Sequence, residues 1–150
     1  MENRNLEILR QNLKSLEKSR FWLSRSFEKA GNIELANELS ENDFDTMENL
    51  TSRFSRTVDL IVRKVFRSID AVELEDSGTL IDVVNRAEKR EIIKSSPKVR
   101  SLKDLRNEIV HEYEIEDLAI VFERTLKSVP EVLEIIENIR KYCLEKKYVG

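Results

Sequence analysis

The sequence predicts an all-α protein, and three observations support that prediction. Its 150 residues include only three glycines and two prolines, so few positions would interrupt a helix. Charged residues make up 37% of the chain and hydrophobic residues 40%, a mixture typical of amphipathic helices with charged outer faces. No segment alternates apolar and polar residues as a half-buried strand would. We therefore predict one domain over residues 1–150, a bundle of four to five principal helices.

Two long helices are predicted in the first half of the chain. Apolar residues recur at steps of three, four or seven through residues 3–29, and Gly31 follows as a stop signal. Ser40 precedes a second helix that runs to about Val72, with acidic residues in its first turn, where they favour the helix dipole. Because about ten residues join the two helices, we expect an antiparallel hairpin.

Shorter helices are predicted after a polar loop. The third spans about residues 78–94 and is expected to end before Pro97, because the residue before proline disfavours helix. Ser101 is the expected N-cap of a fourth helix, with Asp104 as the acid of a capping box.

The last part of the chain is predicted as two helices and a tail. A short fifth helix covers about residues 116–126. Ser128 and Pro130 together form a start signal for a separate last helix. Residues 146–150 are expected to be frayed, as chain ends often are.

Composition also bears on where the protein resides. The lone cysteine, Cys143, cannot form a disulfide within the chain and fits a packing residue in a reducing compartment. The N-terminus lacks the apolar run of a signal peptide, and no apolar run approaches the ~20 residues of a membrane span. We therefore expect a soluble, cytoplasmic protein with no membrane contact.

Charge is unevenly distributed, although the net charge is only −3. Residues 31–50 hold six acids and no base, whereas residues 86–106 hold eight Lys or Arg and three acids. The simpler interpretation of either segment is a solvated surface. The alternative places the basic segment beside a phosphate-bearing ligand, and the candidate RNA-binding residues are Lys98, Arg100 and Lys103.

The stretch RNEIVHEY, residues 106–113, carries the single histidine of the chain. On a regular helix Arg106 falls at the border of the apolar face, and Asn107 and His111 face away from the core. Arg106 and His111 then point about 140° apart, so they would hardly act together within one straight helix. A two-fold dimer that packs this helix against its copy would bring both side chains into one cleft.

These residue types fit metal-independent RNA cleavage. A histidine transfers protons near neutral pH, an arginine stabilises a phosphate as its charge develops, and an asparagine amide bonds phosphate or orients the imidazole. The simpler alternative is an ordinary exposed histidine. We expect neither a metal nor a cofactor, because one histidine and one distant cysteine form no ligand cluster and no glycine-rich phosphate loop is present.

The chain resembles the HEPN superfamily and, more narrowly, the HepT toxins encoded beside minimal nucleotidyltransferases. The motif R-x-x-x-x-H-x-Y is matched by Arg106, His111 and Tyr113, with the polar Asn107 after the arginine, and the resemblance is best over about residues 99–145. It implies a homodimeric α-bundle with the motif in a cleft between subunits and, in many members, endoribonuclease activity. His111 would then be the general acid/base and Arg106 the phosphate binder, supported by Asn107.

The HepT resemblance further implies a partner. A minimal nucleotidyltransferase antitoxin silences the toxin by transferring AMP from ATP to the motif tyrosine, which corresponds to Tyr113. The added AMP would block RNA by its bulk and its negative charge. An alternative role for Tyr113 is a packed aromatic, since a regular helix would place it on the core side.

Two other functions stay open at the level of sequence. One is a non-catalytic nucleotide- or substrate-binding companion of a nucleotidyltransferase, which the acidic pI of about 5.4 favours. The other is a helical dimer scaffold.

Elsewhere, Arg56, Asp59 and Arg63 are interpreted as a surface salt-bridge ladder, although an acid of the second helix would be able to reach the motif. Phe21-Trp22 is interpreted as core or dimer interface in preference to a base-stacking platform.

Overall fold

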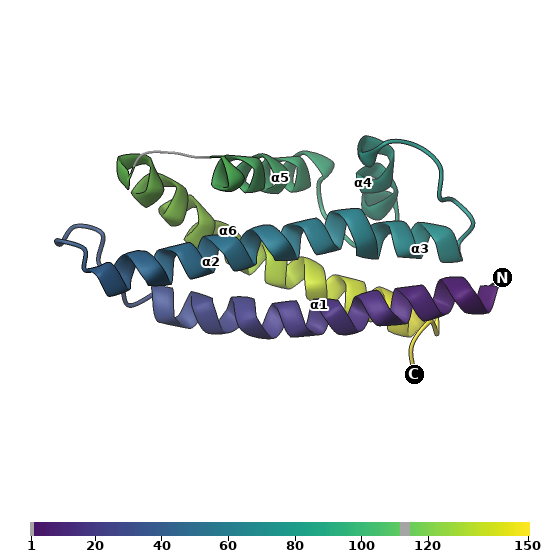
Figure 1. Ribbon diagram of the computed structural model, residues 1–150. Coiled ribbons are helices and arrows are strands. Elements are labelled where there is room, and N and C mark those ends of the chain that lie inside the picture. Colours follow the sequence, from purple (N-terminus) through teal and green to yellow (C-terminus); the bar gives the residue numbers. More distant parts are fainter. Residues whose placement is uncertain (1, 112–114) are drawn as a thin grey trace.

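The computed structural model describes residues 2–111 and 115–150, and it confirms the all-α fold (Figure 1). The elements in chain order are α1 (Glu2–Ala30), α2 (Glu41–Asp59), η1 (Leu60–Val65), α3 (Phe66–Val72), α4 (Leu80–Lys89), α5 (Ser96–Val110) and α6 (Ile115–Glu145). Among these residues, no helix offers a stretch that is both long and apolar enough to cross a membrane.

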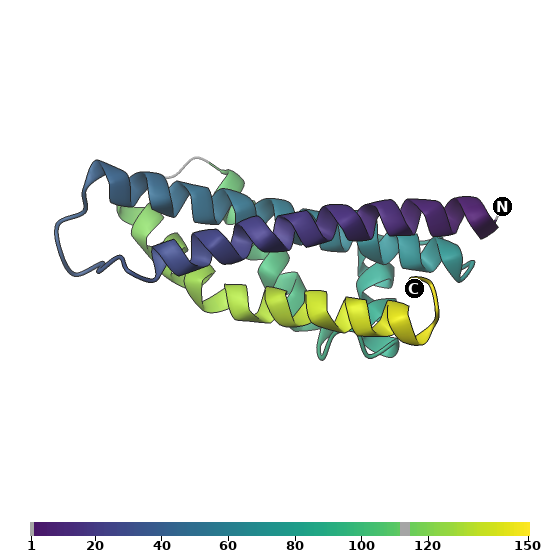
Figure 2. The same ribbon diagram turned by 90° about the horizontal axis from the view of Figure 1, so that it is seen from below.

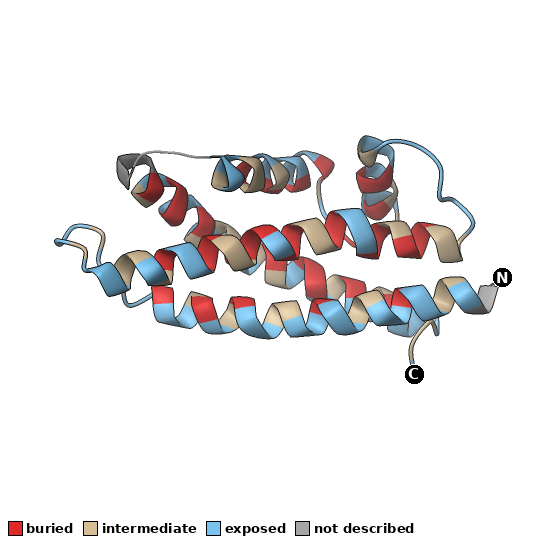
Figure 3. Ribbon diagram, in the orientation of Figure 1, coloured by how far each residue is buried: buried red, intermediate tan, exposed pale blue. Residues whose placement is uncertain are grey.

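The predicted antiparallel hairpin forms the centre of the bundle. Helix α1 lies alongside the run from α2 through η1 to α3, and α6 returns beside α1 (Figures 1 and 2). Helices α4 and α5 cover the opposite side of that run (Figure 1). Buried faces line the space between these elements, with exposed residues outside (Figure 3). In α1 the buried positions recur every seven residues, at Leu9, Leu16, Leu23 and Ala30.

The second long helix runs without a break from Glu41 to Val72 but changes its winding in the middle. Ser40 caps its start, as the sequence pattern predicts, and Asp43 completes a capping box with it. In η1 the winding is π-helical, so the Phe66 N–H donates to the carbonyl of Ile61, five residues earlier. Such wide turns are rare and often occur at functional sites. This one begins directly after Asp59 and packs against α1 and α4.

The boundaries predicted around Pro97 are wrong. Helix α4 ends at Lys89, because Glu91 adopts a positive φ of 63° and the chain turns away there. Ser95, and not Ser101, caps α5: its hydroxyl accepts a hydrogen bond from the Lys98 N–H. Pro97 starts this helix, since a proline in the first turn loses no hydrogen bond.

The predicted break at Ser128 and Pro130 is also wrong, because α6 continues through both residues. The Ser128 hydroxyl donates to the carbonyl of Arg124 within the helix and caps nothing. Buried Val129 and Val132 hold the helix against the core on either side of Pro130. A proline inside a helix removes one hydrogen bond and bends the axis, and α6 changes direction along its length (Figure 2).

The tail for which the sequence predicts fraying makes specific contacts. The Tyr148 N–H donates to the carbonyl of Cys143, and its phenol donates to Glu73 at 2.9 Å. Arg10 of α1 donates to the Tyr148 carbonyl at 2.9 Å. The last turn of the chain is thereby attached to both α1 and the end of α3.

Glu73 belongs to a network of charges that joins α3, α4 and the C-terminal turn. Asp70, whose side chain is only 1% exposed, pairs with Arg86 at 3.0 Å and with Arg90. Glu73 accepts hydrogen bonds from Arg90, Tyr142 and Tyr148. Burial raises the pKa of Glu73, but the two phenols and the Arg90 charge outweigh burial and hold that pKa below its usual value.

We predict that Glu73→Gln lowers the free energy of unfolding by about 1.5–3 kcal/mol at neutral pH, because it removes charged hydrogen bonds from a largely buried group. Since the folded-state pKa of Glu73 is depressed, its contribution is complete above the unfolded-state value of 4.5 and is lost as pH falls below it. Urea unfolding at several pH values measures both effects.

Glu75→Gln is the matched control, because Glu75 is 58% exposed and lies 4.0 Å from Arg90. It should change stability by a few tenths of a kcal/mol. Equal losses in the two variants would contradict the importance of the buried network.

Candidate active site

The motif lies at the C-terminal end of α5, which packs antiparallel to α2. Leu102 and Leu105 of α5 are buried, as the helical pattern predicts, and Ile109 is half-buried. These contacts fix the rotation of α5 so that Arg106 faces the last residue of α2, Asp59.

Arg106 is held in place by two side chains. Its Nε and Nη2 atoms donate to Asp59 Oδ2 at 3.0 and 2.7 Å, and its Nη1 donates to Asn107 Oδ1 at 3.2 Å. The Arg106 side chain is 24% exposed and that of Asp59 is 31% exposed. A guanidinium has five N–H groups, so two of them have no partner among the described residues.

Asn107 therefore acts through its amide oxygen within the chain. Because that oxygen accepts from Arg106, the amide NH₂ group is directed elsewhere and remains able to donate. The residue is half-buried, where a regular outward position would have left it exposed. Asn107 can thus orient the guanidinium and still offer a donor to a ligand.

His111 ends the helix and does not continue it. Its backbone is extended, with φ −83° and ψ 147°, and its N–H donates to the Asn107 carbonyl at 3.3 Å. The side chain is exposed and has no hydrogen-bond partner within residues 2–111 and 115–150. No hydrogen bond or ion pair joins it to Arg106 within these residues, so the described part of one chain does not link the two catalytic candidates directly.

Tyr113 lies outside the described residues. The regular helix that would have carried it to the core side ends at Val110. Both roles considered for Tyr113, a modified residue and a packed aromatic, therefore stay predictions.

An open groove of about 420 Å³ runs beside the pair formed by Asp59 and Arg106. The α2 wall carries hydroxyls and charges, and the α5 wall carries the ends of two apolar side chains. The lining comprises Glu48, Thr51, Ser52, Ser55, Arg56, Asp59, Arg106, Ile109 and Val110. Hydroxyls and guanidinium groups at such a groove suit a polar, phosphate-bearing ligand.

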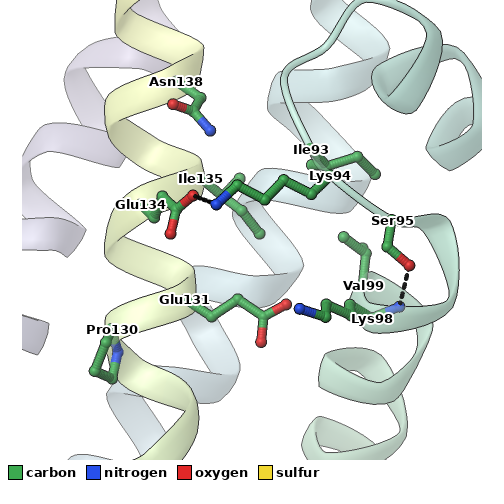
Figure 4. A pocket seen from close by; sticks show the side chains of 10 residues that line it. All are labelled: Ile93, Lys94, Ser95, Lys98, Val99, Pro130, Glu131, Glu134, Ile135 and Asn138. Carbon is green, nitrogen blue, oxygen red and sulfur yellow. Dashed lines mark hydrogen bonds and ion pairs between the residues drawn. The ribbon is translucent and has the colours of Figure 1, made fainter.

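The three basic residues predicted to bind RNA do not share one surface. Lys98 points toward Glu131 of α6, in a hollow where Lys94 also pairs with Glu134 at 2.9 Å (Figure 4). Arg100 and Lys103 line a different groove, on the side of α5 that faces η1 and α4. Only the latter two lie on the flank that leads to Arg106.

Asp59 is the acid of the second helix that reaches the motif, an arrangement that the sequence left open as the alternative to a surface salt-bridge ladder. The predicted ladder is present only in part, because Arg63 Nε lies 3.8 Å from Asp59 Oδ1 while Arg56 has no ion pair in the described part of the chain. A signal was present: Asp59 and Arg106 each border the apolar face of their helix, where facing side chains of opposite charge can meet.

Phe21 and Trp22 are exposed, so they do not belong to the core, and the other part of that prediction, a dimer interface, stays a prediction. The Trp22 ring lies against the guanidinium groups of Arg53 and Arg25, at 5.0 and 5.7 Å from the ring centre. These residues lie on the α1 side of the bundle and take no part in the groove described above.

Within residues 2–111 and 115–150, no group of three His, Cys, Asp or Glu side chains is placed to hold a metal ion. Cys143 is buried, and burial raises the pKa of its thiol to about 11, which leaves it protonated at neutral pH. It packs between apolar side chains of α1 and α6.

We predict a coupling energy of about 1–2 kcal/mol between Asp59 and Arg106 in a double-mutant cycle with Asp59→Ala and Arg106→Ala. The reason is the close, half-buried geometry of the pair. The matched control cycle uses Asp59→Ala and Arg63→Ala, where the 3.8 Å separation and the exposed Arg63 should give about 0.3–0.5 kcal/mol. Denaturant unfolding measures both cycles, and equal couplings would contradict the assigned geometry.

The comparisons with known proteins can be set beside this geometry. The model of the family described as ribonuclease HepT-like matches residues 4–139, which include Asp59, Arg106 and His111. No significant match was found among curated proteins or among solved structures. Because the family match covers most of the chain, and the fold is the helical bundle that the resemblance implies, the protein belongs to the ribonuclease HepT-like family of HEPN type.

Proposed function

We propose that the protein is a metal-independent endoribonuclease and the toxin component of a toxin–antitoxin pair. The family match supports ribonuclease activity in general. The observation that carries the specific proposal is the fixed Arg106 guanidinium at an open polar groove, one helical turn before His111.

The chemistry follows from the groups present. The two unpartnered N–H groups of Arg106 bind the scissile phosphate, and the Asn107 amide donates to it or to the imidazole. His111 takes the proton from the ribose 2′-hydroxyl, whose oxygen attacks the adjacent phosphorus. The bond to the 5′-oxygen breaks, and that oxygen receives the proton held by the His111 imidazolium, leaving a 2′,3′-cyclic phosphate and a 5′-hydroxyl.

Asp59 has two opposing effects on this mechanism. Its carboxylate offsets part of the positive charge that attracts RNA. However, it also holds the guanidinium in one orientation before substrate arrives, which reduces the conformational entropy lost on binding. We assign Asp59 as a positioning residue, because it acts on the phosphate through Arg106.

A homodimer completes the proposed site. Val110 is an exposed apolar residue at the end of α5, and the neighbouring Ile109 is only half-buried. An exposed apolar helix end suits self-association about a two-fold axis. Such a dimer places His111 of one subunit beside Arg106 of the other. The two side chains then act together although they are not linked within a single chain.

We predict that Arg106→Ala and His111→Ala each abolish RNA cleavage by the purified chain and relieve the growth arrest caused by its expression. If the site is shared between subunits, a one-to-one mixture of the two variants regains about a quarter of wild-type activity. Half of the dimers are then mixed, and each mixed dimer has one intact site of two.

Lys94→Ala is the control, since Lys94 lies on the α6 side of α5 and should leave cleavage unchanged. No recovery on mixing, with dimers confirmed by light scattering, would place the whole site in one chain. Undiminished cleavage by His111→Ala would reject its catalytic role. RNA binding without cleavage by the wild type would favour the binding companion that the acidic pI suggests.

We further propose that a minimal nucleotidyltransferase partner inactivates the toxin by adding AMP to Tyr113. The sequence contains three tyrosines, and the phenols of Tyr142 and Tyr148 already donate to Glu73. Burial and the Glu73 carboxylate raise the pKa of both phenols, for Tyr148 to about 12, which makes them poor nucleophiles.

The prediction is that incubation with the partner and ATP adds multiples of the AMP mass to the peptide that contains Tyr113. Tyr113→Phe should take up none, whereas Tyr148→Phe should be modified as the wild type is. Mass spectrometry of peptides locates the group. Modification of Tyr148, or of no tyrosine, would contradict the assignment.

A further inference from the structure

We propose that an apolar groove between η1, α4 and α5 binds one nucleobase of the RNA strand whose phosphate is held by Arg106. This inference rests on the proposed ribonuclease function and adds a substrate subsite to it. The groove has a volume of about 250 Å³. Its lining comprises Val62, Leu80, Ile81, Val84, Val99, Arg100, Lys103 and Asp104.

The groove lies next to the Arg106 site along the same seam between helices. Helix α5 runs antiparallel to the run from α2 into η1, so moving along the two from the Asp59–Arg106 pair follows α5 backwards and η1 forwards. Three residues before Arg106 is Lys103, three residues after Asp59 is Val62, and both line the groove. Lys103, Arg106 and Val110 share one flank of α5. Glu108 lies on the other flank and pairs with Arg124 of α6.

The groove combines an apolar interior with a basic rim on the side of the phosphate site. Arg100 is exposed, Lys103 is half-buried, and neither has an ion pair within the described ranges. Along the helix axis they lie ~9 and ~4.5 Å from Arg106. Their flexible side chains can therefore contact phosphates that follow the one bound by Arg106.

The interior suits a flat, largely apolar ring. Small-molecule sites are mostly apolar, with a few polar groups that fix orientation. Here the walls are aliphatic, and Ile81 is 55% exposed, so the groove opens to solvent at that side. Asp104 is the acceptor at the rim, and a carboxylate selects bases that carry an exocyclic amino group, such as cytosine.

Charge distinguishes this groove from the hollow on the other side of α5. There Lys94 is neutralised by Glu134, and Lys98 points to Glu131 (Figure 4). A polyanion would meet those carboxylates. The basic rim beside Ile81 instead complements a phosphodiester strand, and for that reason we assign its occupant as RNA and not as a second copy of the chain.

The test uses the full-length His111→Ala chain, which binds without cleaving, and a short single-stranded RNA that contains one 2-aminopurine. We expect a change in base fluorescence on binding. Ile81→Glu in the same background should weaken binding about tenfold and remove that fluorescence change, because it places a carboxylate in the groove. Ile8→Glu, at an exposed apolar position of α1, is the matched control and should bind as the parent does.

A second measurement keeps the test independent of folding problems at Ile81. Oligocytidylate should bind more tightly than oligouridylate, and the exposed-site variant Asp104→Ala should remove that preference. In the cleavage-competent chain, Lys103→Ala should raise KM with kcat nearly unchanged, as expected for a contact made equally in the ground and transition states.

The outcomes separate the subsite from the proposed function. Cleavage by the wild type, together with unchanged affinity and fluorescence in Ile81→Glu, would overturn the subsite alone. A loss of dimerisation in Ile81→Glu with unchanged RNA binding would assign the groove to a second copy and also overturn it. Absence of both RNA binding and wild-type cleavage would overturn the subsite and the ribonuclease proposal together.

Discussion

The pairing of Asp59 with Arg106 is the interaction on which the site depends. It joins the end of α2 to the C-terminal half of α5 at 2.7 Å, through two residues that lie 47 positions apart in sequence. The pair exists because the apolar faces of both helices are buried and leave these two residues facing each other at the border. The π-helical stretch that follows directly lines the neighbouring groove together with α4 and α5.

Two clusters of charged residues in this protein differ in whether they leave hydrogen-bond donors for a ligand. Around Asp70 and Glu73, carboxylates, guanidinium groups and phenols pair with one another within α3, α4 and the C-terminal turn, and only Arg86 Nε and Arg90 Nη2 are buried without a hydrogen-bond partner among the described residues. That arrangement is largely closed to solvent and serves stability. Among the described residues Arg106 is instead only partly engaged, and it borders an open groove where its remaining donors can meet a ligand. For this reason the proposed function rests on the Asp59–Arg106 pair and not on the network around Asp70 and Glu73.

The end of α5 determines how the motif residues are displayed. A helix fixes Arg106 and Asn107 relative to each other, whereas His111 follows the last helical residue with an extended backbone. The direction of the imidazole is therefore not fixed at the angle of about 140° from Arg106 that a continuous helix would impose. Together with the exposed Val110, this geometry suits a site that is completed by a second subunit.

The sequence determined the helical class, the long hairpin and the buried faces, because these follow from local periodicity. It also singled out Arg106, Asn107 and His111, whose residue types suit the proposed chemistry. It misplaced the start of α5 and the supposed break at Pro130, because proline permits both a helix start and a bend, and only packing of the surrounding apolar residues decides between them.

Tertiary structure alone decided the partner of Arg106, the separation of Lys98 from Arg100 and Lys103, and the contacts of Tyr148. Each of these depends on which helix faces which, and at what rotation. That information lies in contacts between residues far apart in the chain, which no local pattern specifies.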